Sequence, residues 1–599
     1  MNEQKKTKGA KWFGIPNLVP YMRPYGKLIF WMVLMAFYGS AMDAVIPLFQ
    51  QYAIDHYIAD STLAGLGWFI GAYVVVILTQ TASNYISAFG ACKLELSVGR
   101  DLKRESFNHL QTLSFSYFNQ NSVGYVHARV MSDTDRIAST LAWSMAEGVW
   151  HSAYLVCAIV MMLILNWKMA LCVLVIVPIV AISSMYFQKK LVFFHRQVRE
   201  KNSRITGATT TKTLVVEDKM EKEFDELTAD MKKVSVRAMH FRAIFISTTT
   251  LAASLALALV LWRGGIVTRE GVMLIGTLTV FMNYAQGMME PIQWLVQALS
   301  SLVNVQVNVE RFTTLMETKS DVQDTPEVVE KYGDTFSPKK ENWEELHGDI
   351  EFKDVTFRYP DGDENILEHF NLKVPQGTNV AIVGETGAGK STLVNLVCRF
   401  YEPTEGQVLI DGRDARERSQ LWLHSNIGYV LQTPHLFSGT VLENLRYGRE
   451  NATMGEIEAA VRAVSAEGII ERLPDGYQSD VGEGGNSLST GEKQLLSFAR
   501  ALLADPRIFV LDEATSSVDT VTERLIQDAI EKVMDGRTSF VIAHRLSTIR
   551  RADVILVVNA GKIVERGSHA ELMAKKGVYC GLYTRQYREE QIQASMENE

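Results

Sequence analysis

Hydrophobic positions are distributed very differently in the two halves of this chain. From Leu28 to about Ser301 the sequence contains long apolar runs, whereas from about Glu351 short apolar stretches alternate with polar ones. The first pattern predicts helices of about 20 apolar residues, the length that crosses a hydrocarbon core of roughly 30 Å. The second pattern is typical of a soluble α/β domain. The sequence therefore predicts a polytopic α-helical membrane domain followed by an α/β domain.

Six membrane-spanning helices are expected from the apolar runs. They cover Leu28–Gln50, Ala64–Ala88, Ala142–Leu165, Met169–Phe187, Phe241–Trp262 and Val272–Leu295. Each run is long enough to cross a bilayer, and their repetition argues against isolated core helices. The outer connections are short, and Asn166-Trp167-Lys168 only turns the chain. The longer inner stretches, about Cys92–Leu141 and Gln188–His240, are charged and are expected to extend the helices into the cytosol.

Charge at the start of the chain predicts its orientation. The segment Met1–Lys27 contains several basic residues, whereas Leu28–Cys92 contains no Lys or Arg. The positive-inside rule therefore places the N-terminus in the cytosol and the loop with Asp55 and Asp60 outside. The net charge of −8 gives no reason to expect nucleic acid as a partner. The five cysteines lack CxxC spacing, so neither a disulfide framework nor a zinc site is indicated.

The last expected span carries a row of polar side chains at steps of three and four residues, which places them on one helix face. They are Asn283, Gln286, Glu290, Gln293 and Gln297. Because polar groups facing lipid are costly, we expect this face to line a wet translocation pathway; hydrogen bonding between helices is the alternative. Asp43 in the first span and Glu147 in the third are further acids. Together with Glu290 they favour a cationic or polar cargo.

A glycine-rich loop lies between an expected buried strand, Asn379–Val383, and an expected helix, Thr392–Phe400. The loop has the pattern Gly-x4-Gly-Lys-Ser of a nucleotide-binding P-loop. Glycines let backbone N–H groups close around phosphate oxygens, the lysine reaches the β- and γ-phosphates, and the serine hydroxyl coordinates Mg²⁺. The sequence thus predicts that ATP and Mg²⁺ bind at Gly384, Glu385, Thr386, Gly387, Ala388, Gly389, Lys390, Ser391 and Thr392.

Two more apolar strands end in residues that suit ATP hydrolysis. Ile508–Leu511 runs into Asp512 and Glu513, and Ser539–Ala543 runs into His544. An acid at the end of a buried strand beside a P-loop holds Mg²⁺, and the next acid polarises the attacking water as general base. His544 is placed to contact the γ-phosphate. We therefore expect three strand ends to converge on one nucleotide.

Taken in order, these motifs resemble those of a half-size bacterial ABC exporter of the type IV fold, from about Tyr25 to Gln586. The resemblance implies that Tyr359 stacks on adenine. It also implies that Gln432 is the Q-loop residue, which takes part in catalysis and contacts Mg²⁺ together with Ser391 and Asp512.

The same resemblance implies a location in the cytoplasmic (inner) membrane, with the ATPase domain in the cytosol, and a domain organisation. Residues 1–311 would form the transmembrane domain with long intracellular helices, 312–347 a linker, and 348–590 the nucleotide-binding domain. Coupling helices, which transmit ATP binding to the membrane spans, are then expected near Phe115–Val123 and near Thr206–Thr213. In this family two ATPase domains clamp two ATP molecules, and each site takes its P-loop from one chain and its signature from the other.

The signature of this chain departs from the usual Leu-Ser-Gly-Gly-Gln. It reads Leu488, Ser489, Thr490, Gly491 and Glu492. Thr490 adds bulk where the backbone approaches phosphate, and Glu492 adds negative charge near an anionic ligand. Together with the intact Glu513, this pattern resembles one subunit of the heterodimeric multidrug exporters. A second half-transporter chain is therefore the expected partner, and a homodimer that tolerates both substitutions is the alternative.

The expected function is ATP-driven export of small amphipathic substrates by a dimer with one consensus and one degenerate ATP site. Membrane lipid and a small-molecule cargo are the other expected partners. A homodimeric lipid or peptide exporter and an ATP-gated channel stay open as alternatives. A regulatory half that only binds ATP is a further class, and the intact Glu513 and His544 argue against it.

Overall fold

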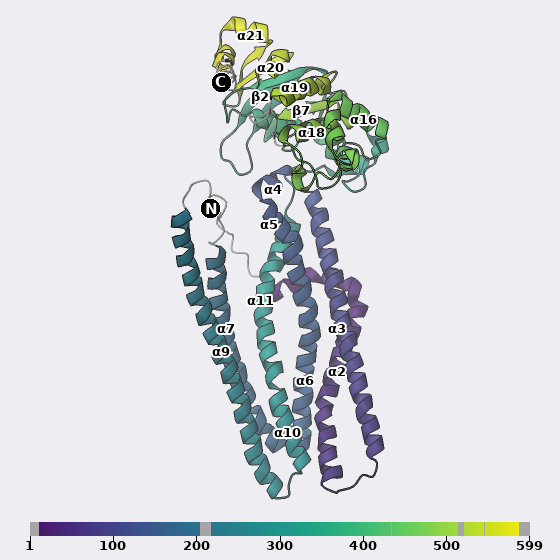
Figure 1. Cartoon of the computed structure of the whole chain (residues 1–599), viewed down its shortest axis with the longest axis vertical. Helices are drawn as coiled ribbons and strands as arrows, with labels where there is room; N and C mark the ends of the chain where they lie inside the picture. Colours follow the sequence, from purple (N-terminus) through teal and green to yellow (C-terminus); the bar gives the residue numbers. More distant parts are fainter. Residues whose placement is uncertain are drawn as a thin grey trace. The chain divides into compact units, whose positions relative to one another are not determined.

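The computed structural model describes residues 11–203, 217–432, 434–512, 520–543, 545–585 and 587 (Figure 1). The chain splits into two compact units. The first comprises Met1–Leu110 and Val123–Thr318, and the second comprises Gln111–Ser122 and Lys319–Glu599. The second expected coupling helix, near Thr206–Thr213, lies outside the described residues.

Long helices form the first unit. The longest are α2 (Gly26–Tyr52), α3 (Leu66–Gln111), α6 (Thr134–Leu174), α7 (Ile176–Ser203) and α9 (Glu217–Arg269). Helix α2 packs against α6, and α7 runs beside α9 (Figure 1). Short helices α1 (Val19–Met22) and α5 (Val123–His127) also lie before α6. Among the described residues, five helical segments are long and apolar enough to cross a membrane. Many large apolar side chains on them are exposed, as lipid-facing positions require.

Asn166 builds the turn between the third and fourth expected spans. The element α6 consists of two helices that meet at Asn166, whose backbone is not helical (φ −161°, ψ 102°). The Asn166 Oδ1 atom accepts hydrogen bonds from the backbone N–H groups of Lys168 (3.1 Å) and Met169 (3.2 Å). This satisfies N–H groups that have no partner at the start of a helix. The expected turn at Asn166-Trp167-Lys168 is therefore confirmed.

The sixth expected span, Val272–Leu295, is not one continuous helix. It is divided at Met288 into α10 (Ile275–Gly287) and α11 (Met289–Glu317). Pro291 explains the break, because a proline has no N–H to donate to the carbonyl of Gly287 and its ring clashes with that carbonyl. The predicted polar row is consequently shared between two helices, and α11 continues well beyond the expected end. Helix α11 packs against α6 and α7.

The second unit contains two sheets in its described part. One is antiparallel, with the order β2-β1-β4-β5, and the other has the order β10-β9-β3-β8-β7-β6. The strands are β1 (Ile350–Phe357), β2 (Leu367–Val374), β3 (Asn379–Val383), β4 (Glu405–Ile410), β5 (Arg413–Asp414), β6 (Ile427–Val430), β7 (Ile508–Asp512), β8 (Thr538–Ile542), β9 (Val554–Asn559) and β10 (Lys562–Gly567). Strands β3, β7 and β8 are parallel and almost fully buried. Parallel strands covered on both faces read as continuous apolar runs. The expected strands beside the P-loop are thus confirmed.

Helices cover the sheets of the second unit. They are α4 (Phe115–Gln120), α12 (Pro326–Tyr332), α13 (Lys390–Val397), α14 (Gln420–Ser425), α15 (Val441–Arg446), α16 (Met454–Ala463), α17 (Glu467–Arg472), α18 (Thr490–Leu503), α19 (Thr520–Met534), α20 (Leu546–Arg551) and α21 (His569–Lys575). Alternate residues of the central strands enter two apolar cores, one containing Phe509 and Phe498, the other Val510 and Phe540. The alternation follows from the two-residue period of a strand.

Candidate functional site

Three parallel strands bring the candidate catalytic loops to one edge of the larger sheet. Ile542 of β8 is paired with both Ile382 of β3 and Asp512 of β7. The strands therefore end at the same level, with the P-loop after β3 and Asp512 at the end of β7. Glu513 follows the last residue of β7, and His544 follows Ala543. Both lie outside the described residues. For the described part, the predicted convergence of strand ends is confirmed.

The P-loop backbone requires its glycines. At Gly384 a Cβ atom would lie 2.2 Å from the carbonyl oxygen of Val558. Gly389 has φ +99°, in the left-handed region that side chains disfavour, and it caps α13. The Lys390 Nζ atom donates hydrogen bonds to the carbonyls of Gly384 (2.8 Å) and Glu385 (2.9 Å). The ammonium is thus held over the loop, where nucleotide phosphates bind in P-loop proteins.

Lys390 and Asp512 influence each other electrostatically. Burial lowers the pKa of Lys390, and the negative charge of Asp512 partly opposes that shift. A desolvated ammonium without enough anionic partners is a strong attractor for phosphate oxygens. The geometry therefore suits a triphosphate at this loop.

The predicted Mg²⁺ ligands supply three oxygen donors. Ser391 offers a hydroxyl in the first turn of α13, Gln432 an amide carbonyl after β6, and Asp512 a carboxylate after β7. Oxygen donors with a single carboxylate fit Mg²⁺, which usually takes its other ligands from phosphates and water. No cluster of three or more His, Cys, Asp or Glu suited to a metal occurs in the described ranges. The residues present thus match a nucleotide-bound magnesium rather than a metal cage.

Tyr359 stands beside the P-loop helix. Its hydroxyl lies 3.1 Å from the hydroxyl of Thr392. The rings of Phe357 and Tyr401 meet the Tyr359 ring edge-on, at centroid distances of 4.9 and 5.0 Å. Such contacts fix the orientation of an aromatic ring. Tyr359 is therefore a fixed, half-buried aromatic surface next to the phosphate loop.

The signature residues form the N-terminus of α18. Ser489 caps this helix: its hydroxyl accepts from the Glu492 N–H (3.3 Å), and the Glu492 Oε2 accepts from the Ser489 N–H (2.8 Å). Leu488 and Gly491 are buried, whereas Ser489 and Thr490 are exposed. The other carboxylate oxygen, Glu492 Oε1, forms an ion pair with Arg472. No sequence motif marks Arg472, because the turn that brings α17 to α18 is a tertiary feature.

Comparisons with known proteins identify the family. Residues 29–292 match the family described as ABC transporter transmembrane region, and residues 367–516 match the family described as ABC transporter. An uncharacterised ABC transporter ATP-binding protein of Bacillus subtilis, YfiC, is 33% identical over 97% of this chain and 95% of its own length. The chain belongs to the ABC transporter family. It is a half-size exporter that combines one membrane region with one ATPase, so ATP hydrolysis is coupled to transport.

Other relatives of this ABC exporter have more specific names. A probable multidrug resistance ABC transporter ATP-binding/permease protein of B. subtilis, YheH, is 36% identical over 86% of this chain and 75% of its own length. The ATP-dependent lipid A-core flippase of Desulfotalea psychrophila is 33% identical over 95% of this chain and 98% of its own. A solved structure of a bacterial Atm1-family ABC exporter with ATP bound has a TM-score of 0.76 at 27% identity, covering 94% of this chain and 98% of that one.

The first expected coupling helix contacts the ATPase core of this exporter. Helix α4 belongs to the same compact unit as the sheets, although it comes much earlier in the sequence. The Phe115 ring stacks on Phe400 at a centroid distance of 4.8 Å. The Ser116 hydroxyl donates to Asp321 (2.6 Å), and the Asn119 amide donates to the hydroxyl of Tyr401 (3.0 Å).

Arg399 is a second residue that the sequence analysis missed. Only 2% of its side chain is exposed, and it forms salt bridges of 2.9 Å with both Asp324 and Glu402. Its guanidinium also donates to the carbonyls of Gln323 and Arg418. Five N–H donors in a rigid fork make an arginine suited to such a site. Arg399 thereby anchors the start of the expected linker on the ATPase core of the exporter.

The polar membrane residues are not assembled into one site. Asn283 donates to the Gln50 side chain of α2 (2.6 Å), and Gln80 donates to Asp43. Gln286 and Glu290 are exposed, and Gln293 is half-buried. Among the described contacts, no hydrogen bond or ion pair joins Asp43 to any of the α10 and α11 residues. Interhelical hydrogen bonding, the alternative to a wet pathway, therefore accounts for Asn283 and Asp43.

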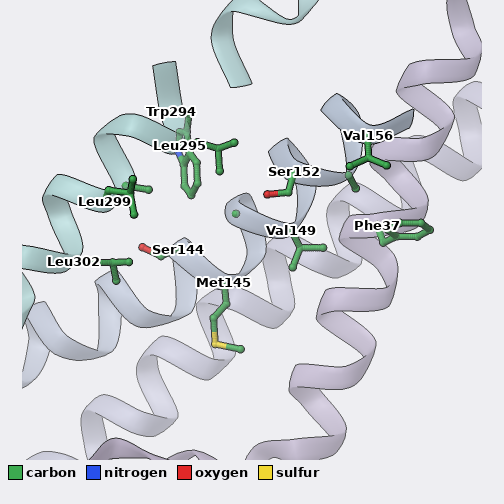
Figure 2. Close-up of a pocket in the computed structure, with 13 residues that line it drawn as sticks. Phe37, Ser144, Met145, Val149, Ser152, Val156, Trp294, Leu295, Leu299 and Leu302 are labelled. Atoms are coloured by element: carbon green, nitrogen blue, oxygen red, sulfur yellow. The ribbon is translucent and has the colours of Figure 1, made fainter. Parts of the chain in front are cut away.

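An apolar cavity of about 680 Å³ lies in the membrane domain of the exporter, between α2, α6 and α11. Figure 2 shows Phe37, Met145, Val149, Trp294 and Leu302 among the side chains around it. The five predicted pathway residues do not line it. The Trp294 indole N–H donates to Glu147 Oε2 (2.6 Å), which gives that acid a partner inside the protein. The sequence does not predict this cavity, because the apolar residues that line it have the same residue types as lipid-facing positions in a membrane helix.

Proposed function

We propose that this half-transporter exports small amphipathic molecules across the cytoplasmic membrane as one subunit of an ABC heterodimer with unequal ATP sites. The observation that carries the proposal is a P-loop whose Lys390 is bonded to the loop carbonyls, combined with a signature whose Glu492 carboxylate stands at the N-terminus of α18. The N-terminus of a helix favours anions, so a carboxylate there opposes binding of a γ-phosphate. An asymmetric pair of sites follows from that difference.

The proposed ATP site uses the residues at the sheet edge. Lys390 and the loop from Gly384 to Thr392 bind the phosphates, and Tyr359 stacks on adenine. Ser391, Gln432 and Asp512 hold Mg²⁺, which neutralises phosphate charge. Glu513 accepts the proton of the attacking water as general base, and His544 and Gln432 orient the γ-phosphate and that water. In this proposal residues 1–311 form the membrane domain, 312–347 the linker and 348–590 the ATPase domain.

Coupling to transport needs two states with different affinities for ATP. To shift the conformational equilibrium from 1:99 to 99:1, ATP must bind the favoured state more tightly than the other state by roughly 5.5 kcal/mol. We propose that closure of two ATPase domains around ATP supplies this preference and that α4 passes the movement to the membrane helices. Its contacts with Phe400, Asp321 and Tyr401 support this role.

Removal of the α4 contact is expected to reduce coupling. In Asn119→Ala the hydrogen bond to Tyr401 is lost, and we expect cargo-stimulated ATPase activity to fall about three- to tenfold, because one hydrogen bond contributes about 0.5–1.5 kcal/mol. Basal ATPase activity is expected to change much less. The measurement is ATPase activity in proteoliposomes with and without cargo. Asn121→Ala is the matched control, since among the described residues that amide bonds only within its own segment, to the Tyr117 carbonyl (2.8 Å). Equal stimulation in both variants would contradict the role of α4.

The cargo proposed here is amphipathic. The cavity bounded by Phe37, Met145 and Trp294 is almost entirely apolar, which suits an apolar body. The exposed Gln286 and Glu290 on α10 and α11 offer polar contacts elsewhere on the membrane helices. The names of relatives, a multidrug transporter and a lipid A-core flippase, agree with cargo of this class.

The test of the proposal compares this chain alone with the pair formed with a second half-transporter from the same genome. We expect ATPase activity and uphill accumulation of a fluorescent amphipathic dye in inside-out vesicles only for the pair. Full activity of this chain alone would establish a homodimer and contradict the heterodimer. Dye movement that only equilibrates would indicate an ATP-gated channel and contradict the pump.

A further inference from the structure

Arg472 is fixed beside the signature by two contacts. Its guanidinium forms an ion pair with Glu492, and its Nε atom donates to the Gly468 carbonyl of its own helix (3.0 Å). The Arg472 side chain is 69% exposed and that of Glu492 18% exposed. Both carboxylate oxygens of Glu492 are engaged, since the other accepts from the Ser489 N–H. The carboxylate is consequently held in one place on α18.

The ion pair is not needed to complete the helix cap. Helices α15 and α21 begin with the same kind of capping box, formed by Thr440 with Glu443 and by Ser568 with Glu571. In the part of the chain that the structure describes, Glu443 and Glu571 form no salt bridge, whereas Glu456 in the capping box of α16 pairs with Arg449. A box of this kind is complete with its two reciprocal hydrogen bonds. The ion pair of Arg472 with Glu492 is therefore an addition to the cap rather than a part of it.

The carboxylate of Glu492 stays ionised at neutral pH. Burial raises its pKa, but the hydrogen bonds from Ser489 and the charge of Arg472 outweigh burial and hold the pKa below its ordinary value. A carboxylate in the first turn of a helix offsets the partial positive charge of the helix N-terminus, which would otherwise attract a phosphate. Protonation does not remove this charge at neutral pH, so a neighbouring cation is what can offset it when a phosphate approaches.

We propose that Arg472 is a positioning residue that allows this glutamate-containing signature to accept the γ-phosphate of ATP bound on the partner's P-loop. Arg472 acts through Glu492 by offsetting its charge and holding its carboxylate against the Ser489 N–H. The Ser489 hydroxyl accepts from the Glu492 N–H and so keeps its own proton for a phosphate oxygen. The inference rests on the proposed function, because the signature faces a nucleotide only in the dimer.

The test isolates the ATP site that uses this signature. Lys390→Ala in this chain, paired with an unaltered partner, disables the other site. In that background the Kd for a fluorescent Mg–ATP analogue is measured with Arg472→Gln, Glu492→Gln and both. We expect Arg472→Gln to raise Kd about three- to tenfold, an effect typical of a charge at a helix terminus. Glu492→Gln is expected not to weaken binding, and the double variant is expected to bind like Glu492→Gln.

Two control variants and the salt dependence of Kd test whether the effect of Arg472→Gln is electrostatic and specific to this ion pair. Arg449→Gln removes the ion pair of Arg449 with Glu456, which stands in the capping box of α16, and is expected to leave Kd unchanged. Arg472→Lys keeps the charge and is expected to restore most of the affinity. The loss in Arg472→Gln should also shrink at high salt, because exposed charges are screened.

Three results would overturn the inference. One is a wild-type Kd in Arg472→Gln. Another is an equal loss in Arg472→Gln and in the double variant, which would mean that Arg472 acts independently of Glu492. The third is a well-formed dimer whose remaining site, with the natural signature, binds no Mg–ATP; this would overturn the inference, whereas the proposed inequality of the two sites would stand.

Discussion

Glu513→Gln is expected to reduce steady-state ATP hydrolysis of the active dimer by about a hundredfold or more, because general-base catalysis contributes roughly 10²–10⁴-fold. Glutamine has nearly the same size but accepts no proton from the attacking water. The phosphate-binding loop and Lys390 are untouched, so ATP binding is expected to stay near the wild-type level. Glu513 directly follows Asp512, the last residue of β7, which pairs with Ile542 of β8.

The measurement combines ATPase rates with equilibrium binding of Mg–ATP to the same preparation. Glu405→Gln is the matched control, since Glu405 is an exposed carboxylate at the start of β4 and the same chemical change there should leave turnover unaltered. Turnover retained in Glu513→Gln would remove this residue from its proposed role. A parallel loss of ATP binding would show that it acts on affinity rather than on proton transfer.

Lys390→Ala is expected to weaken ATP binding at this chain's P-loop by about tenfold to a hundredfold, since a hydrogen bond to a charged group contributes about 1.5–3 kcal/mol. The ammonium is already in place, bonded to the carbonyls of Gly384 and Glu385. Loss of the side chain leaves those carbonyls without their cation and the phosphates without their strongest partner. Hydrolysis by the pair is expected to fall accordingly.

Binding of Mg–ATP to the pair, resolved into two sites, is the measurement for Lys390→Ala. The control is Lys373→Ala, because Lys373 is an exposed lysine on β2 whose nearest carboxylate oxygen, on Glu351, is 4.0 Å away. Surface ion pairs of that kind contribute little. Unchanged affinity at both sites in Lys390→Ala would contradict the assignment of the P-loop.

Some structural features were predictable because they depend on neighbours in the sequence. The Asn166 turn is local, since one side chain caps the next helix, and it was correctly expected. The continuous sixth span was an incorrect expectation, although its cause, Pro291, is visible in the sequence. Apolar length alone predicted a continuous helix there, whereas a proline interior to a helix breaks it at about the preceding turn.

Other features depend on residues that only folding brings together. The pairs Arg472–Glu492, Arg399–Asp324 and Asn119–Tyr401 join positions that are distant in sequence and carry no motif. The cavity beside Trp294 is similar, because its apolar walls come from three helices. Sequence periodicity places a side chain on a face but does not identify the element packed against that face.

By itself, the sequence determined the kind of protein: apolar runs long enough to cross a bilayer, and a P-loop followed by Asp512, Glu513 and an altered signature. These features are decided by local composition and short spacing, which set helix length and phosphate-binding loop geometry. Only the tertiary structure decided that α4 belongs with the ATPase core and that Arg472 forms an ion pair with Glu492. Both depend on packing between distant segments, where burial and charge act through space rather than along the chain.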